Sequence, residues 1–373
     1  MRIDCRLNTQ KITYILFLFI LILPFAMNLL GMHSLLSSTQ SIVCVSILLT
    51  LCWILNFSKS THINDMYILL LNLIFLTLNL FINMSFGVVL NFYNIIITFL
   101  VLKNLQFSRQ QIKRIRGVLV VCLIILLSSF SITQAYGSLL VYSGNTYINA
   151  NTYGILWLAL FFNLILLIDL HVSNRLWKIW LLALTILISM SFIWASGCRT
   201  ALFALVFFCV MCMMKKLDCK KVFVVLIVAG FILPSIYIAL SEAYGDVQLM
   251  GKNLFSGRQN VWAKTWEQIK LSPILGTGTT LMIDIGNGNY TDSAHNVYLG
   301  IWKTIGIVPL VTFVVYLFKF SNTQHHNTIG KKAFLSCLLV CIFETVLNDS
   351  NYNILYISLL MTVQEQKNNK ENL

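Results

Sequence analysis

Apolar residues follow one another along this chain in long runs, and short polar segments separate the runs. A run of about 20 apolar residues predicts a membrane-spanning α-helix, because a helix of that length crosses the hydrocarbon core of a bilayer. The pattern predicts an all-α transmembrane bundle of about 12 spans, or about 11 if the short last span crosses only in part. The predicted spans are 12–30, 41–57, 66–82, 87–102, 117–134, 153–170, 177–195, 200–214, 222–240, 297–319, 333–347 and 352–363.

Composition supports the same class of protein. Hydrophobic residues make up 58% of the chain and charged residues 10%, whereas about a quarter of the residues of a soluble domain are charged. This excludes a soluble enzyme and a disordered chain. The formal net charge of +13 would ordinarily suggest an acidic partner, but the apolar bulk has to be accommodated in a membrane first, so no nucleic-acid partner is predicted.

The basic residues predict the orientation of the spans, because the cytoplasmic loops of membrane proteins carry the excess of Lys and Arg. With the N-terminus in the cytoplasm, 20 of the 26 Lys and Arg residues fall on inner segments, and the alternation holds at every loop. The basic residues left on the outer side are Arg199, Lys252, Arg258, Lys264, Lys270 and Lys303. The charge excess is therefore interpreted as an orientation signal.

One outer loop is far longer than the others and divides the chain into three parts. Residues 1–240 hold the first nine spans, residues 241–296 form the loop, and residues 297–373 hold the last three spans and a short cytoplasmic tail. A helix is predicted within the loop at 259–270, since Pro273 stops a helical pattern there. The two tryptophans of this helix suit either the outer membrane interface or packing over the loop.

Arginines in two polar segments on the predicted outer face are candidates for phosphate binding. Arg199, in Ser-Gly-Cys-Arg-Thr, is the only charge in the short outer loops, although a lone arginine at a helix end often reaches for lipid headgroups instead. Arg258, in Ser-Gly-Arg, offers a planar fork of donors that suits phosphate oxygens. It lies just before a predicted helix start, where backbone amides also favour an anion. An ordinary surface arginine is the alternative.

His295 lies in a third polar segment, Asp-Ser-Ala-His-Asn-Val-Tyr-Leu. Asp292 or Ser293 is expected to cap the tenth span, which would place His295 in its first turn and Gly306 on almost the same helix face. Because an imidazole accepts a proton near neutral pH, His295 is a candidate base. A capping histidine, or one that faces lipid headgroups, is the alternative.

Other polar residues near the outer face are weaker candidates. The segment 271–280 contains a Gly-x-Gly turn at Gly276 that lacks the Lys and Ser/Thr of a phosphate-binding P-loop. Glu344 is an intramembrane acid near the outer end of the eleventh span, and such acids are functional candidates by location alone. Asp349 and Asn351 beyond it are candidates for an acceptor site. The spacing of the acidic and histidine residues is not diagnostic of a metal site.

The order of these segments resembles the bacterial O-antigen polymerase and O-antigen ligase superfamily, integral-membrane glycosyltransferases that act on polyprenyl-linked glycans. Ser-Gly-x-Arg-Thr opens a span, and Ser-Gly-Arg-x3-Trp follows after two more helical stretches. Ser-Pro-Ile-x-Gly-x-Gly then precedes Ser-Ala-His-Asn-x-Tyr-Leu, so the matches cover residues 196–309. The chain departs from the family pattern at Cys198, and it has one long outer loop where family polymerases often have two.

The resemblance implies a reaction and the residues that perform it. The donor would be a glycan on undecaprenyl pyrophosphate at the outer face of the bacterial cytoplasmic (inner) membrane, and the acceptor a sugar hydroxyl. Arg199 and Arg258 would bind the pyrophosphate, and His295 would deprotonate the hydroxyl as it attacks the anomeric carbon with inversion. The pyrophosphate linkage is already activated, so no cofactor, nucleotide or metal is expected. The predicted substrate-binding residues are Asn296, Gly257, Gly276 and Glu344.

Several functions compete within this interpretation. A polymerase that joins lipid-linked repeat units into O-antigen or capsular polysaccharide is the leading hypothesis, with a chain-length regulator protein as a further partner. The same motifs fit an O-antigen ligase that transfers finished glycan to the lipid A core. A flippase or other transporter of lipid-linked oligosaccharide would have two similar halves and charges in central helices, and the sequence has neither. A scaffold without catalysis would leave the Arg and His residues unexplained.

Overall fold

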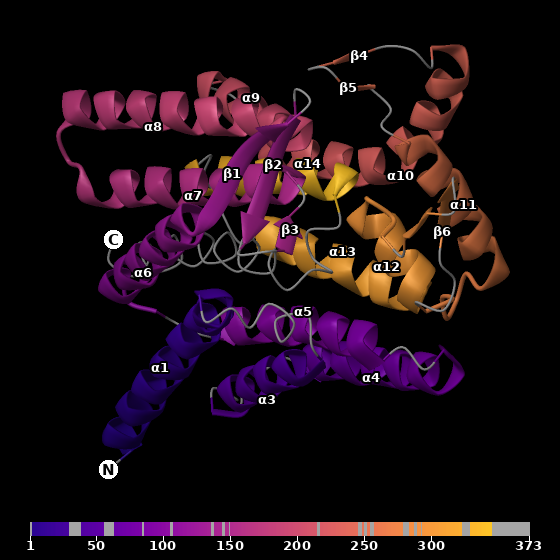
Figure 1. Ribbon diagram of the computed structural model, residues 1–373. Helices are drawn as coiled ribbons and strands as arrows, with labels where there is room; N and C mark the ends of the chain where they lie inside the picture. Colours follow the sequence, from indigo (N-terminus) through magenta and orange to yellow (C-terminus); the bar gives the residue numbers. More distant parts are fainter. Residues whose placement is uncertain are drawn as a thin grey trace.

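Helices make up most of the molecule, as the apolar runs predict (Figure 1). The computed structural model describes residues 2–29, 39–55, 63–83, 86–104, 107–135, 138–143, 146–148, 150–214, 217–244, 248–249, 252–253, 257–278, 283–286, 289–291, 293–322 and 329–344. The helices are α1 (Arg2–Leu29), α3 (Thr39–Leu55), α4 (Ile63–Asn83), α5 (Phe86–Asn104), α6 (Arg109–Ser128), α7 (Ala150–His171), α8 (Arg175–Ser196), α9 (Arg199–Met213), α10 (Cys219–Ala243), α11 (Arg258–Leu271), α12 (Val297–Ile305), α13 (Ile307–Asn322) and α14 (Ile329–Phe343). Each predicted span from 12–30 to 333–347 overlaps at least one of these helices, whereas the last span, 352–363, lies outside the described residues.

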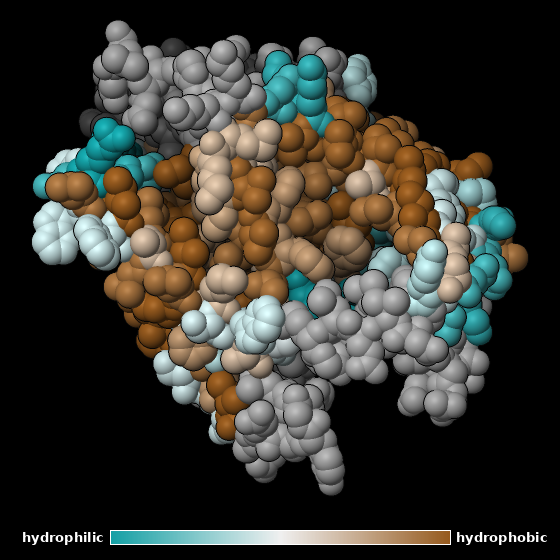
Figure 2. Space-filling view, turned by 90° about the horizontal axis from the view of Figure 1, so that it is seen from above, coloured by the Kyte–Doolittle hydropathy of each residue, from teal (hydrophilic) through white to brown (hydrophobic). Residues whose placement is uncertain are grey.

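Several helices have the length and the surface of membrane spans. Within the part of the chain that the structure describes, four helices are long and apolar enough to cross a membrane, and these are Asp65–Asn83, Asn151–His171, Arg175–Ser196 and Cys219–Ala243. Near the ends of α8 the exposed side chains include Trp177, Trp180 and Trp194, and tryptophan is enriched at membrane interfaces. Figure 2 shows apolar side chains over the middle of one face and polar ones toward its edges. The helical membrane class is confirmed in kind, and the number of spans stays a prediction.

The helix α14 is largely enclosed by other helices. Every residue from Gly330 to Leu338 is buried, because α7, α9, α10 and α12 all pack against this helix. On the other side of the molecule α3, α4 and α5 lie together, and α12 and α13 lie between them and the upper helices (Figure 1). The residue that follows α14, Glu344, is therefore brought among elements from several parts of the chain.

The structure corrects the predicted fifth span, 117–134. A capping box between Ser108 and Gln111 starts α6 at Arg109, so the polar turn before residue 117 belongs to the helix and the helix ends at Ser128. The chain then forms an antiparallel sheet of β1 (Phe130–Ala135), β2 (Ser138–Ser143) and β3 (Thr146–Ile148). Two short hairpins occupy part of the predicted outer loop, β4 (Gln248–Leu249) with β5 (Lys252–Asn253) and β6 (Ile283–Gly286) with β7 (Asn289–Thr291).

The predicted tenth span, 297–319, is not one continuous helix. It is divided at Gly306, which has a φ of 91°, a conformation that favours glycine. A Cβ atom at this position would overlap the carbonyl oxygen of Ile274. The Ile307 N–H donates to the carbonyl oxygen of Pro273 at 3.1 Å, so the segment around Pro273 supplies the hydrogen bonds that the interrupted helix gives up. The expectation that Gly306 shares a helix face with His295 is wrong for this reason.

The helix α4 contacts the divided segment through a polar face. Asp65, Asn72 and Asn79 recur at intervals that bring them to one side of the helix, and they are 2%, 0% and 0% exposed. Asp65 lies 3.5 Å from Lys319 Nζ, Asn72 donates to Thr312 Oγ1 at 3.0 Å, and Asn79 donates to the carbonyl oxygens of Leu275 at 2.5 Å and Thr304 at 2.9 Å. These contacts hold α4 against the C-terminal end of α12 and against α13 at two positions along its length.

Candidate active site

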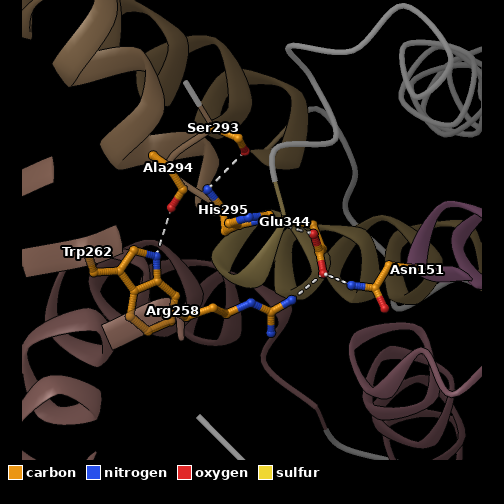
Figure 3. A network of polar contacts seen from close by, with 7 residues as sticks. All are labelled: Asn151, Arg258, Trp262, Ser293, Ala294, His295 and Glu344. Carbon is orange, nitrogen blue, oxygen red and sulfur yellow. Dashed lines mark hydrogen bonds and ion pairs between the residues drawn. The ribbon is translucent and has the colours of Figure 1, made fainter. Parts of the chain in front are cut away.

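The Glu344 carboxylate is the centre of a polar cluster formed by residues from four parts of the chain (Figure 3). Its Oε1 atom accepts hydrogen bonds from Arg258 Nη2 and from Asn151 Nδ2, the latter at 3.2 Å. Its Oε2 atom lies 3.6 Å from Nδ1 of His295. Arg258 begins α11, Asn151 lies in the first turn of α7, and His295 precedes α12. We call Asn151, Arg258, His295 and Glu344 the Glu344 cluster.

Arg258 reaches the cluster because of how α11 begins. Gly257 is the N-cap residue, with a φ of 73°, and the left-handed turn starts the helix at Arg258 itself rather than after it. The Arg258 side chain is only 12% exposed. Its guanidinium is therefore held in a largely enclosed site by an ion pair.

Trp262 anchors α11 to the rest of the protein. The side chain is fully buried, and its Nε1 donates to the carbonyl oxygen of Ala294 at 2.9 Å (Figure 3). The ring of Tyr237 on α10 meets it edge-on at 5.0 Å between centroids, and Trp266 meets Trp302 in the same way at 5.7 Å. Of the two placements predicted for this helix, packing over neighbouring elements is the one observed for Trp262.

His295 occupies a strained backbone position. Among the described residues it is the one non-glycine residue with a positive φ, 47°, a conformation that costs about 1–3 kcal/mol and recurs at functional sites. Its N–H donates to Ser293 Oγ at 3.3 Å. The side chain is 32% exposed, so the imidazole meets Glu344 at one nitrogen while part of the ring stays accessible.

The cap of α12 differs from the prediction. Asn296, and neither Asp292 nor Ser293, caps this helix, since Asn296 Oδ1 accepts from the Leu299 N–H at 3.0 Å. His295 consequently lies before the helix and not in its first turn. Asn296 Nδ2 donates to the carbonyl oxygen of Gly230 at 2.8 Å. Both the oxygen and the nitrogen of this buried side-chain amide are therefore hydrogen-bonded to the backbone. Asn296 thus positions the segment that carries His295, whereas Asp292 lies outside the described residues.

Arg199 approaches the same region from α9. It is the first residue of that helix, partly exposed, and it interacts electrostatically with Arg258, Tyr237 and Glu344. The preceding Cys198 is buried and packs against Gly154, where a Cβ atom would overlap the cysteine side chain. The structure thus places the two predicted arginines, Arg199 and Arg258, close enough to interact electrostatically.

Gly276 serves a different part of the molecule. It has a φ of 74°, and a Cβ atom there would lie 2.5 Å from the carbonyl carbon of Thr304. Asn83 donates to its carbonyl oxygen at 3.2 Å, and the next residue, Thr277, donates its N–H to the carbonyl oxygen of Lys303 at 2.7 Å. These contacts explain the glycine by close backbone packing at the end of α12. The Asp349 and Asn351 candidates lie outside the described residues.

The part of the chain that holds most of these residues resembles a known family. Residues 184–314 match the family model described as O-antigen ligase. This segment belongs to the O-antigen ligase and polymerase superfamily. It contains Arg199, Arg258 and His295, whereas Asn151 and Glu344 lie outside it. Searches of curated proteins and of solved structures found no match to the chain.

The match of residues 184–314 to the O-antigen ligase family and the long apolar helices together support a membrane enzyme in O-antigen biosynthesis. Family members are membrane glycosyltransferase-like enzymes that act on lipid-linked oligosaccharides. The Glu344 cluster contains a guanidinium that can bind an anion, an imidazole that can accept a proton, and a carboxylate that faces the imidazole.

Asn151 and Tyr237 are the residues near the cluster that the sequence did not predict. Asn151 stands where a short uncharged outer loop meets an apolar run, and Tyr237 lies inside an apolar run. Neither position carries a spacing signal, because their neighbours in the cluster are remote in the sequence. The packing of α7 against α14 brings Asn151 to Glu344, and the packing of α10 against α11 brings Tyr237 near Arg258.

Proposed function

We propose that this protein is a membrane glycosyltransferase that polymerises undecaprenyl-pyrophosphate-linked oligosaccharide repeat units into O-antigen or capsular polysaccharide. The observation that carries the proposal is the convergence of Arg258 and His295 on the buried carboxylate of Glu344. Both Arg258 and His295 lie in the segment that matches the O-antigen ligase family. The excess of Lys and Arg on the opposite segments supports an active site on the outer face of the bacterial inner membrane.

In the proposed reaction the cluster binds one glycan and activates the other. Arg258 and Arg199 bind the pyrophosphate of the donor and neutralise the charge that develops as it leaves. His295 takes the proton of the acceptor hydroxyl, and the hydroxyl oxygen attacks the anomeric carbon from the side opposite the pyrophosphate. The glycosidic bond forms as the bond to pyrophosphate breaks, with inversion at the anomeric carbon. The activated linkage supplies the driving force, so the proposed mechanism uses no metal.

In this mechanism Glu344 sets the tautomer and the orientation of the His295 imidazole. A carboxylate at Nδ1 favours the tautomer with the proton on Nδ1, and it leaves the lone pair of Nε2 for the acceptor hydroxyl. The same carboxylate stabilises the imidazolium that forms when the hydroxyl proton is transferred. Glu344 is thus a positioning residue, in place of the substrate-binding role suggested by its location alone.

Reconstitution tests the proposal. The purified protein in liposomes with undecaprenyl-pyrophosphate-linked repeat units is expected to give a ladder of longer lipid-linked glycans and free undecaprenyl pyrophosphate. Nuclear magnetic resonance of the new linkage is expected to show an anomeric configuration opposite to that of the donor. Retention of configuration, or no polymer from a stably folded protein, would contradict the proposed reaction.

The family description itself favours a second candidate, an O-antigen ligase that transfers finished glycan to the lipid A core. Loss of the gene separates the two. Loss of a polymerase leaves a single repeat unit attached to the core, whereas loss of a ligase leaves lipid-linked polymer that is not attached. A chain-length regulator protein is a proposed partner only in the polymerase case.

A further inference from the structure

The neighbours of Glu344 engage its two oxygens unequally. Oε1 accepts from both Arg258 and Asn151, whereas Oε2 lies 3.6 Å from His295 Nδ1. A hydrogen bond from nitrogen to oxygen spans about 2.7–3.2 Å, so this second contact is too long to be one. The Nδ1 atom is buried and has no hydrogen-bond partner among the described residues. One oxygen thus holds two donors while the other faces an unsatisfied nitrogen.

A phosphate group bound at Arg258 would compete with Glu344. The Nη2 atom of Arg258 donates to the carboxylate, and a pyrophosphate is a strong competitor for the guanidinium because it carries at least two negative charges in total and its oxygens match the planar fork. A pyrophosphate that pairs with this edge of Arg258 takes the donor that Oε1 holds. The carboxylate then loses its ion pair with Arg258.

His295 lies next to the released carboxylate, with its Nδ1 atom 3.6 Å from Oε2. The Glu344 side chain is 10% exposed, and a charge so enclosed is strongly unfavourable without a partner. A shift of under about 1 Å brings Oε2 within hydrogen-bond distance of His295 Nδ1. Asn151 continues to hold the carboxylate from α7, and the Glu344 N–H donates to the carbonyl oxygen of Val340 at 2.9 Å, so the backbone of Glu344 need not move.

We propose that the Glu344 carboxylate pairs with Arg258 while no donor is bound. When the pyrophosphate of the donor binds to Arg258, the carboxylate pairs with His295 instead. The base is then completed only after the donor is in place. This coupling rests on the proposed function, because it assigns the phosphate to Arg258 and the proton transfer to His295. It also predicts that Glu344 opposes donor binding while it promotes turnover, which is the opposite of a substrate-binding role.

Binding of inorganic pyrophosphate to the purified full-length protein tests this coupling. Glu344→Gln removes the competing charge and keeps the shape, so it is expected to bind pyrophosphate about 10-fold more tightly than the unaltered protein by calorimetry. With lipid-linked donor its kcat is expected to fall by roughly 100-fold or more. The matched control is Glu242→Gln at the exposed end of α10, for which neither quantity should change.

The outcomes separate this inference from the function on which it rests. If Arg258→Ala lowers pyrophosphate affinity but Glu344→Gln leaves it unchanged or lowers it, the partner exchange is wrong and the phosphate-binding role of Arg258 stands. If Arg258→Ala has no effect on binding, the proposed phosphate site itself is wrong. Should Glu344→Gln fail to fold, Glu344→Asp keeps the charge but withdraws it from Arg258, and tighter pyrophosphate binding is again expected.

Discussion

Arg258 is held in the site both by its position at the start of α11 and by its ion pair with Glu344. Its place at the start of α11 depends on the left-handed turn at Gly257, and its guanidinium is paired with Glu344 in a site that is largely closed to solvent. Both features depend on the shape of the side chain as well as on its charge. A lysine at this position would keep the charge but present a single nitrogen in place of a planar fork.

Arg258→Lys is therefore expected to impair the enzyme although it conserves charge. One charge-assisted hydrogen bond contributes about 1.5–3 kcal/mol, so kcat/KM for the lipid-linked donor should fall roughly 10- to 100-fold. Steady-state kinetics on the reconstituted protein would measure this. Lys270→Arg, at an exposed position near the other end of α11, is the control for a basic exchange on the same helix. Normal kinetics of Arg258→Lys would show that the fork geometry is not used.

Site residues could be predicted from the sequence where they belong to a short local motif, and not where their contacts are with remote parts of the chain. Arg258 and His295 stand out because they are polar residues in short motifs on a hydrophobic chain. The order of those motifs was enough to suggest the superfamily, which the family match confirms. Asn151 carries no such signal, since its contact with Glu344 joins residues 193 positions apart. The cap at Asn296 was missed because Asp, Ser and Asn are similar N-cap residues.

Among the helices, the α12–α13 break has the greatest bearing on the site. A helix interrupted within an apolar environment needs partners for the backbone groups it frees. The segment around Pro273 and the Asn79 side chain of α4 provide them at Ile307 N–H and at the Thr304 carbonyl. The short α12 is thereby fixed at its far end, while Asn296 fixes the end next to His295.

Asn79→Leu tests whether α4 supports this break. The substitution leaves the Leu275 carbonyl without the Asn79 donor, and a buried unsatisfied acceptor costs about 1–3 kcal/mol. We expect a lower melting temperature of the detergent-solubilised protein, measured by tryptophan fluorescence. Asn83→Leu removes a single, longer hydrogen bond to Gly276 and should cost less. Equal losses from the two substitutions would argue against a special role for Asn79.

The helices were largely predictable, and their interruptions were not. Apolar runs mark helices because burial in lipid requires both apolar side chains and internal backbone pairing. A break such as that at Gly306 leaves no gap in hydropathy, since its freed groups are paired by residues remote in the sequence. The strand β1 was missed because most of its residues fall in the apolar run 117–134, which the hydropathy pattern predicts as one span.

At the scale of the whole molecule, the distribution of charge predicts which end of the bundle faces the cytoplasm. Lys221, near the start of α10, has a side chain that is 85% exposed and belongs to the basic inner segments. Glu267 on α11 is exposed and belongs to the predicted outer loop. In a background without native cysteines, Glu267→Cys should react with an impermeant maleimide in intact cells. Lys221→Cys should react only after permeabilisation, and the reverse pattern would overturn the orientation.

The most direct test of the proposed chemistry is the transfer activity of His295→Ala. In liposomes that contain undecaprenyl-pyrophosphate-linked repeat units, the unaltered protein and His171→Ala, a control at an exposed histidine of α7, should both form polymer. His295→Ala should retain its fold and lose polymer formation by about 100-fold or more, the contribution of a general base. Normal polymer formation by a stably inserted His295→Ala would contradict the assignment of His295 as the base.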